Sequence, residues 1–157
     1  MDEGLYVGRN DALVFAQRTR KNLEIIEMAV KMDPNIHVVT QLVNSLLGLL
    51  VFLRERQFLK HVGQQTLDKL VSRGWPRVEC TKGECPTLGD FIYHLRNAVA
   101  HGRVKFSSDS RDLGEVTIDF EDWKPGASEA YWSACMKAND LRDFCLNLIG
   151  LLEDTIG

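Results

Sequence analysis

The apolar residues of this 157-residue chain recur at two different spacings, and the change between them constrains the fold most. Through most of the chain they return every three or four residues, as on one side of an α-helix. After Gly102 the spacing drops to two, and it becomes helical again at Leu141. This pattern predicts a mainly α protein, a helical bundle with a small antiparallel β insertion before the C-terminal helix.

The long helices of this bundle can be placed from their caps. Residues 1–9 are expected to form a loose tail, with Asn10–Asp11 capping a first helix that ends near Met32. A second helix is expected from about Asn35 to His61, and its middle is apolar nearly all round. Such a helix lies at the centre of a bundle or also supplies a dimer face. Asn139-Asp140 is expected to cap the last helix.

The shorter elements follow the same reasoning. A short helix is expected over Thr66 to Ser72, followed by a polar loop over residues 77–86. Alternating apolar and polar residues predict half-buried strands at Val104–Phe106 and Val116–Phe120. The segment Tyr131–Met136 alternates again and is a candidate third antiparallel strand.

Composition and length limit the class of protein. The chain is 45% apolar and 26% charged, which is typical of a soluble globular protein, and residues 1–157 are expected to form a single domain. The start, Met1-Asp2-Glu3-Gly4, is acidic and no signal peptide is expected. The longest apolar run, Leu46 to Leu53, is far short of the ~20 residues that span a bilayer. We therefore expect a cytoplasmic protein with no membrane partner.

The four cysteines do not form a recognisable metal site. Cys80 and Cys85 are separated by four residues, but no second pair of ligands at tight spacing completes a zinc site. A disulfide framework is not expected without a secretory signal. Cys80 and Cys85 are interpreted as loop thiols, and Cys135 and Cys145 as small buried side chains.

The segment from Thr87 to Lys105 carries the densest set of reactive groups. Thr87 and Asp90 can form a capping box, in which each side chain bonds the other residue's backbone N–H. Gly102 can adopt the left-handed conformation that ends helices. The sequence thus predicts a helix from about Leu88 to His101.

One face of this helix is polar. His94, Asn97 and His101 follow one another at helical spacing, and Arg96 lies beside them. Between Arg73 and Lys105, six basic residues against three acidic ones give a net charge of +3, whereas the whole chain carries −3. This positive region fits a confined anion site, and it also fits chance. An amphipathic helix with a polar face needs no activity, so the ordinary interpretation stays open.

The segment Arg96–His101, R-N-A-V-A-H, resembles the R-x(4–6)-H motif of the HEPN superfamily, many of whose members carry Asn directly after the Arg. The resemblance implies an up-and-down helical bundle over most of the chain. It also implies that two copies pair through bundle faces, so that both motifs line one cleft. HEPN toxins neutralised by nucleotidyl transfer usually carry a Tyr two residues after the motif His. Arg103 occupies that position here, which puts that mode of control in doubt.

The residue types favour metal-independent chemistry on a phosphodiester. A guanidinium matches a phosphate with paired donors, and an imidazole exchanges protons near neutral pH. The sequence shows no carboxylate cluster for Mg²⁺ and no glycine-rich phosphate loop, so no cofactor or metal is expected. RNA supplies its own nucleophile, the 2′-hydroxyl, and the protein then only moves protons and stabilises charge.

These observations predict an endoribonuclease that cleaves single-stranded RNA. Arg96, Asn97 and His101 are the candidate catalytic residues, and Asn97 could orient the His101 ring or bind a substrate oxygen. In-line cleavage benefits from both an acid and a base, so either His94 or a second protomer's His101 completes the pair.

The rim of the site and its context complete the hypothesis. His94, Arg103 and Lys105 are the candidate RNA- and phosphate-binding residues. A homodimer is expected, with an antitoxin protein as a further candidate partner and toxin–antitoxin or phage defence as the context. The alternative is a HEPN module that binds nucleotide, RNA or a protein partner without cleaving. Asn44 is either an ordinary exposed residue or a support for the motif helix.

Overall fold

The computed structural model describes residues 3–55 and 59–156. The expectations for residues 1–2 and 56–58 lie outside these ranges. The elements, in chain order, are α1 (Glu3–Met32), α2 (Val38–Glu55), α3 (Leu59–Val62), α4 (Leu67–Ser72), β1 (Glu79–Lys82), α5 (Leu88–Ala100), β2 (Val104–Phe106), the 3-10 turn η1 (Leu113–Glu115), β3 (Thr117–Asp122), β4 (Trp132–Lys137) and α6 (Ala138–Ile156). The expected class, mainly α with a small antiparallel β insertion, is confirmed.

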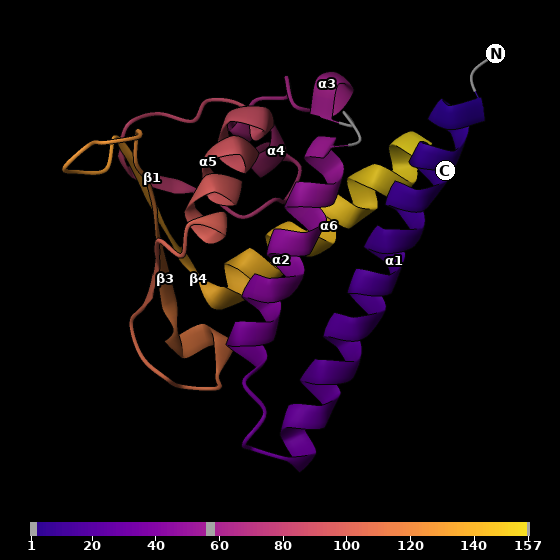
Figure 1. Ribbon diagram of the computed structural model, residues 1–157. Coiled ribbons are helices and arrows are strands. Elements are labelled where there is room, and N and C mark those ends of the chain that lie inside the picture. The colour runs from indigo at the N-terminus through magenta and orange to yellow at the C-terminus, as the bar shows by residue number, and fades with distance from the viewer. Residues whose placement is uncertain (1–2, 56–58, 157) are drawn as a thin grey trace.

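Three long helices form one side of the molecule. Figure 1 shows α1 lying alongside α2, with α6 crossing behind α2. The apolar middle of α2 is buried, as at Leu42, Leu46 and Leu49, so α2 lies at the centre of the bundle, one of the two expected arrangements. Ion pairs also join α1 to α6, from Arg20 to Glu153 and from Arg142 to Glu27.

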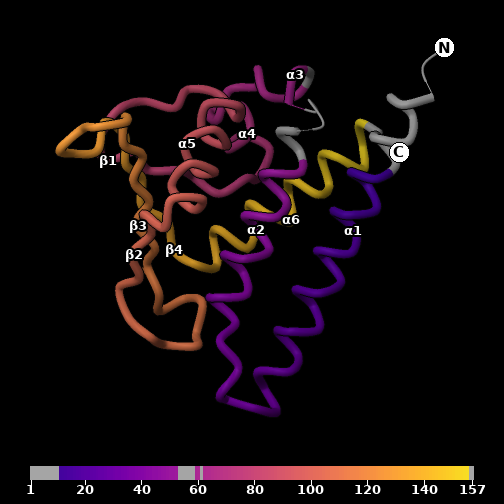
Figure 2. The backbone as a smooth tube through the Cα atoms, viewed as in Figure 1, coloured from indigo at the N-terminus to yellow at the C-terminus, as the bar shows by residue number. Residues whose placement is uncertain are grey.

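A four-stranded antiparallel sheet forms the other side, with the strand order β1-β4-β3-β2. Figure 2 shows β2 running along β3 at one edge of this sheet. Val104 pairs with Phe120, and Ile118 pairs with Met136. Paired residues on antiparallel strands point to the same face, so these apolar side chains define the inner face of the sheet.

Helix α5 lies between this inner face and α2 (Figure 1). Aromatic side chains fill the contact: Phe91 of α5 lies 5.1 Å from Phe144 of α6 and 6.2 Å from Trp132 of β4, measured between ring centroids. All three side chains are buried. The polar edge of α5 is consequently held against the sheet by a packed core.

Several helix starts differ from the sequence-based prediction. Helix α1 begins at Glu3, so Asn10–Asp11 lies inside it and residues 3–9 are not a tail. Extending an existing helix adds one hydrogen bond per residue, which outweighs a weak cap signal. Helix α2 begins at Val38 because Asp33 closes a turn instead, accepting from the backbone N–H of Asn35 at 2.9 Å.

Helix α6 begins at Ala138, before the expected cap at Asn139-Asp140. Strand β4 ends at Lys137, so no residue separates strand from helix. The backbone N–H of Ala138 donates to the carbonyl of Val116 at 2.9 Å, so the sheet itself supplies the acceptor at this junction.

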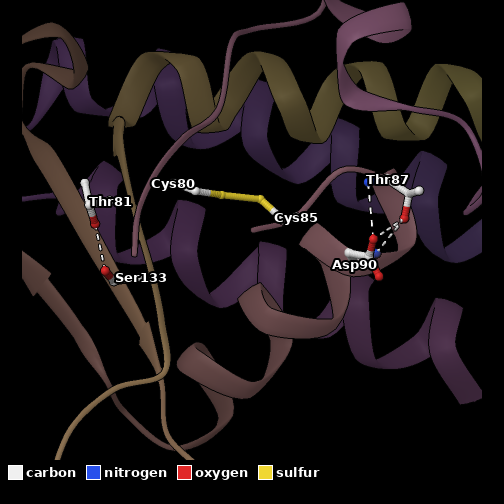
Figure 3. The surroundings of a disulfide bond; sticks show 6 residues. All are labelled: Cys80, Thr81, Cys85, Thr87, Asp90 and Ser133. Carbon is white, nitrogen blue, oxygen red and sulfur yellow. Dashed lines mark hydrogen bonds between the residues drawn. A yellow bond between two sulfur atoms is a disulfide. The ribbon is translucent and has the colours of Figure 1, made fainter. Parts of the chain in front are cut away.

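The segment 77–86 is not only a polar loop, because Glu79–Lys82 forms the edge strand β1. Glu79 pairs with Cys135 of β4, and the hydroxyls of Thr81 and Ser133 lie 2.7 Å apart. Cys80 and Cys85 form a disulfide, contrary to the expectation of free loop thiols (Figure 3). Cys80 lies on β1, and Cys85 follows five residues later, beyond Gly83, whose φ of +71° lies in the left-handed region.

Candidate functional site

Both ends of α5 are fixed by local hydrogen bonds. Thr87 Oγ1 accepts from the backbone N–H of Asp90 at 3.2 Å, and an Asp90 carboxylate oxygen accepts from the Thr87 backbone N–H at 3.3 Å. The predicted capping box is thus confirmed, and Figure 3 shows it. It sets where the helix starts and therefore which residues share its polar face.

The other end of α5 is closed by a six-residue turn. The backbone N–H of Arg103 donates to Ala98 at 2.8 Å, and that of Gly102 donates to Val99 at 3.1 Å. Gly102 has a φ of +66°, as the left-handed residue of such a helix end requires. His101, inside this turn, is the C-cap residue that follows the last helical residue, Ala100, in agreement with the predicted end of the helix.

The polar groups of α5 converge on Asp122, the last residue of β3. One oxygen of this carboxylate, Oδ2, lies 2.8 Å from His94 Nδ1. The same oxygen accepts from Asn97 Nδ2 at 3.1 Å and from the Tyr131 hydroxyl at 2.9 Å. The site is therefore a buried carboxylate with three donors, two of them from the predicted polar stripe.

Asp122 is only 4% exposed. A buried carboxylate is costly unless hydrogen bonds or an opposite charge offset the loss of water. Here three donors from α5 and the β3–β4 connection supply that compensation. Because an ionised carboxylate can only accept, the contact with His94 requires a proton on Nδ1.

His94 is held by more than its bond to Asp122. Its ring stacks on that of Trp132, with 4.6 Å between centroids and 10° between planes, and it meets Tyr131 edge-on at 5.5 Å. The side chain is 12% exposed. The structure therefore places His94, a candidate phosphate-binding residue, in a packed aromatic setting next to Asp122.

Tyr131 stays a donor over a wide pH range. Burial first, and then the hydrogen bond to Asp122, raise the pKa of its hydroxyl well above the usual value for tyrosine. The proton therefore remains on the phenol oxygen, pointing at the carboxylate.

Arg96 is linked to this cluster indirectly. Its Nη1 donates to Asn97 Oδ1 at 3.2 Å. Its Nε–H is buried and has no acceptor within the part of the chain that the structure describes. Arg96 and Asn97 are thus brought together, and Asn97 joins the guanidinium to Asp122.

His101 is exposed at the end of the helix, one turn beyond Asn97. Its backbone N–H donates to the Asn97 carbonyl at 3.1 Å. Its side chain makes no hydrogen bond to any described residue, so the imidazole is open to solvent and to a ligand.

Arg103 and Lys105, the other two candidate phosphate-binding residues, differ in their surroundings. The Arg103 guanidinium lies over the Trp123 ring, 4.4 Å from its centroid. Lys105 pairs with Asp119, one position out of phase with the buried pairs of the sheet, so it lies on the face turned away from α5. Asn44 is exposed on α2, which favours its ordinary interpretation.

Sequence reasoning missed Asp122, Tyr131 and Trp132. The sequence does contain a signal for Asp122. Every second side chain of β3 is buried, first Ile118 and then Phe120, and Asp122 is the next residue in that series. A carboxylate in register with buried apolar side chains needs donors from a neighbouring element. No comparable signal marks Tyr131, which lies just outside β4.

Two broader properties concern only the described ranges, 3–55 and 59–156. They hold no group of three or more His, Cys, Asp or Glu side chains placed to bind a metal ion. They also hold no helix with the length and apolar character needed to cross a membrane.

A family model described as HEPN pEK499 p136 matches residues 6–156. No curated protein and no solved structure matches the chain.

Proposed function

This chain belongs to the HEPN pEK499 p136 family, and with it to the HEPN superfamily, and on that premise we propose that it is a metal-independent endoribonuclease acting on single-stranded RNA. HEPN domains are nuclease or nucleotide-binding modules. The choice between the two depends on the site rather than on the fold.

The observation that supports cleavage is the placement of His101 relative to Arg96. The exposed imidazole lies one helical turn beyond Asn97, whose side chain holds the Arg96 guanidinium. A cation that can bind a phosphate is thus only five residues before an exposed imidazole, a side chain of the type that serves as a general acid or base. Neither side chain is needed to fill the core.

The reaction assigned to these groups is transesterification. A neutral imidazole takes the proton of the ribose 2′-hydroxyl, whose oxygen forms a bond to the adjacent phosphorus. The bond to the 5′-oxygen breaks, and that oxygen receives a proton from an imidazolium. The products are a 2′,3′-cyclic phosphate and a 5′-hydroxyl. Arg96 stabilises the charge that develops on the phosphoryl oxygens.

This mechanism needs two imidazoles, and the geometry favours a second copy of the chain as the source of the other. His94 Nδ1 is committed to Asp122, and its ring is stacked on Trp132. His101 is exposed and available to a shared cleft. We therefore propose a homodimer in which two copies of Arg96, Asn97 and His101 face one another across a two-fold axis.

The test compares wild type with His101→Ala and Arg96→Ala on structured and unstructured RNA, with and without EDTA. We expect EDTA-resistant cleavage of the unstructured RNA that leaves cyclic-phosphate ends. Loss of a proton-transfer group should lower kcat by roughly 10²-fold or more. His37→Ala is the matched control, because His37 is an exposed histidine that precedes α2 and is not part of the motif.

Equal cleavage by wild type and His101→Ala would contradict a nuclease function, and RNA binding without cleavage would favour the alternative binding module. Light scattering tests the dimer. A mass near twice the 17.8 kDa of one chain at micromolar concentration is expected, and a mass near one chain would count against a shared cleft. Co-purification of a partner encoded beside the gene tests the proposed toxin–antitoxin or defence context.

A further inference from the structure

The buried carboxylate of Asp122 lies outside the sequence motif, yet it contacts the motif directly. We infer that Asp122 is a positioning residue that sets the direction of the Arg96 guanidinium through Asn97. The inference rests on the proposed function in one respect, because that function gives Arg96 a phosphate to bind. Its geometric part, the ordering of Arg96, can be measured without any substrate.

The Asn97 amide can satisfy both neighbours in one orientation only. Its Nδ2 faces the Asp122 carboxylate at 3.1 Å, and its Oδ1 faces Arg96 Nη1 at 3.2 Å. Turning the amide over would place an oxygen against the carboxylate and an NH₂ group against the guanidinium. Asp122 therefore decides which end of Asn97 is presented to Arg96.

The carboxylate also has a firm position of its own. It is 4% exposed, and His94 and Tyr131 donate to the same oxygen that accepts from Asn97. Hydrogen bonds to an ionised group are about twice as strong as neutral ones. The Asp122 carboxylate is thus held in place by the sheet and the aromatic packing. Because Asn97 bonds to it, the Asn97 side chain on α5 is held in place as well.

The arrangement around Arg96 is not one that stability alone favours. Its Nε–H is buried without an acceptor among the described residues, and a buried donor of this kind destabilises the folded state. A guanidinium held in this way has a defined direction before any ligand arrives. Pre-ordering of a phosphate-binding group reduces the entropy lost on binding.

The experiment uses Asp122→Asn and Asn97→Ala in the full-length chain, each made alone and together with Arg96→Ala. The first readout is the exchange rate of the Arg96 Nε–H with water, followed by NMR. We expect exchange about tenfold faster or more in both single variants. Asn97→Ala removes the acceptor of Arg96 Nη1, and Asp122→Asn removes the charged acceptor that orients the Asn97 amide, so in both the buried Nε–H becomes open to water. An unchanged rate in folded Asp122→Asn would overturn the inference.

The second readout is the Kd for a single-stranded DNA of the cleaved sequence, which has no 2′-hydroxyl and is not cut. Each variant should weaken binding about tenfold in the wild-type background and less than twofold in the Arg96→Ala background. The same loss in both backgrounds would show that Asp122 acts on stability alone, and would contradict a role through Arg96.

Two controls separate positioning from folding. Ile118→Val loosens the packing of the same strand without touching the carboxylate, and should leave the exchange rate of Arg96 unchanged. Tyr131→Phe removes one donor to Asp122 but leaves the bond to Asn97, so it should have a smaller effect than Asp122→Asn. If the wild type neither binds nor cleaves nucleic acid, the proposed function fails, while the exchange rates still decide whether Asp122 orders Arg96.

Discussion

The imidazole of His94 lies flat against the indole of Trp132, with 4.6 Å between ring centroids and 10° between ring planes. The stack joins α5 to β4, and the bond from His94 to Asp122 joins α5 to β3. Two histidines on one face of the same helix thus have different environments, since His101 is exposed and has no side-chain bond among the described residues.

This difference predicts that substituting the two histidines changes the free energy of unfolding by very different amounts. His94→Ala should lower the free energy of unfolding by about 2–4 kcal/mol, because it removes the stack and leaves Asp122 with one donor fewer. His101→Ala should change it by less than about 0.5 kcal/mol, as is usual for an exposed side chain. Urea denaturation of both variants measures this. Equal losses would contradict the distinction.

Tyr131 predicts a loss of stability at alkaline pH. Burial and the bond to Asp122 raise the pKa of its hydroxyl in the folded state, whereas in the unfolded chain it titrates near pH 10. Above about pH 10 the unfolded state releases this proton and the folded state keeps it, so the free energy of unfolding falls as pH rises. Below that pH the contribution is complete. Denaturation from pH 8 to 11 should show a shallower slope in Tyr131→Phe than in wild type.

The capping box of α5 predicts a moderate effect at Thr87. Thr87→Ala removes the acceptor for the Asp90 backbone N–H and should cost about 1 kcal/mol. Thr87→Ser keeps a hydroxyl in the same place and should behave like wild type. Thermal or urea unfolding compares the three proteins, and an equal loss in both variants would show that the methyl group, not the cap, matters.

The disulfide predicts a local response to reduction. Cys80 and Cys85 enclose a short loop between β1 and α5, so opening it should cost at most about 2 kcal/mol. Amide exchange should accelerate in β1, an edge strand, while α5 keeps its protection. Cys135→Ser, which alters a free cysteine of β4, is the control. Peptide mapping without reductant that finds no link between Cys80 and Cys85 would contradict the pairing.

The elements that could be predicted from the sequence are those set by local chemistry. The limits of α5 follow from Thr87 and Gly102, which act within a few residues of the helix ends. The exposed, partly charged segment Glu79–Lys82 shows no apolar alternation, and it becomes a strand only because β4 offers a partner. A strand that forms because of tertiary pairing need not show an alternating apolar pattern in its sequence.

The same contrast applies to the candidate site. Helical spacing was enough to place His94 and Asn97 on one face of α5. Their shared acceptor, Asp122, lies 25 residues beyond Asn97 on a strand, and only the packing of β3 against α5 brings them together. The motif therefore indicated the polar side chains of α5, but not Asp122, the residue that accepts hydrogen bonds from two of them.

The junction between Lys137 and Ala138 has a consequence for how the chain tolerates change in length. Strand passes into helix there without a spare residue. One inserted residue would rotate everything after it by about 100° around the helix axis. The apolar stripe of α6 would then turn away from α1 and α2, so natural or engineered insertions should be absent from this point even though it lies far from His101 in sequence.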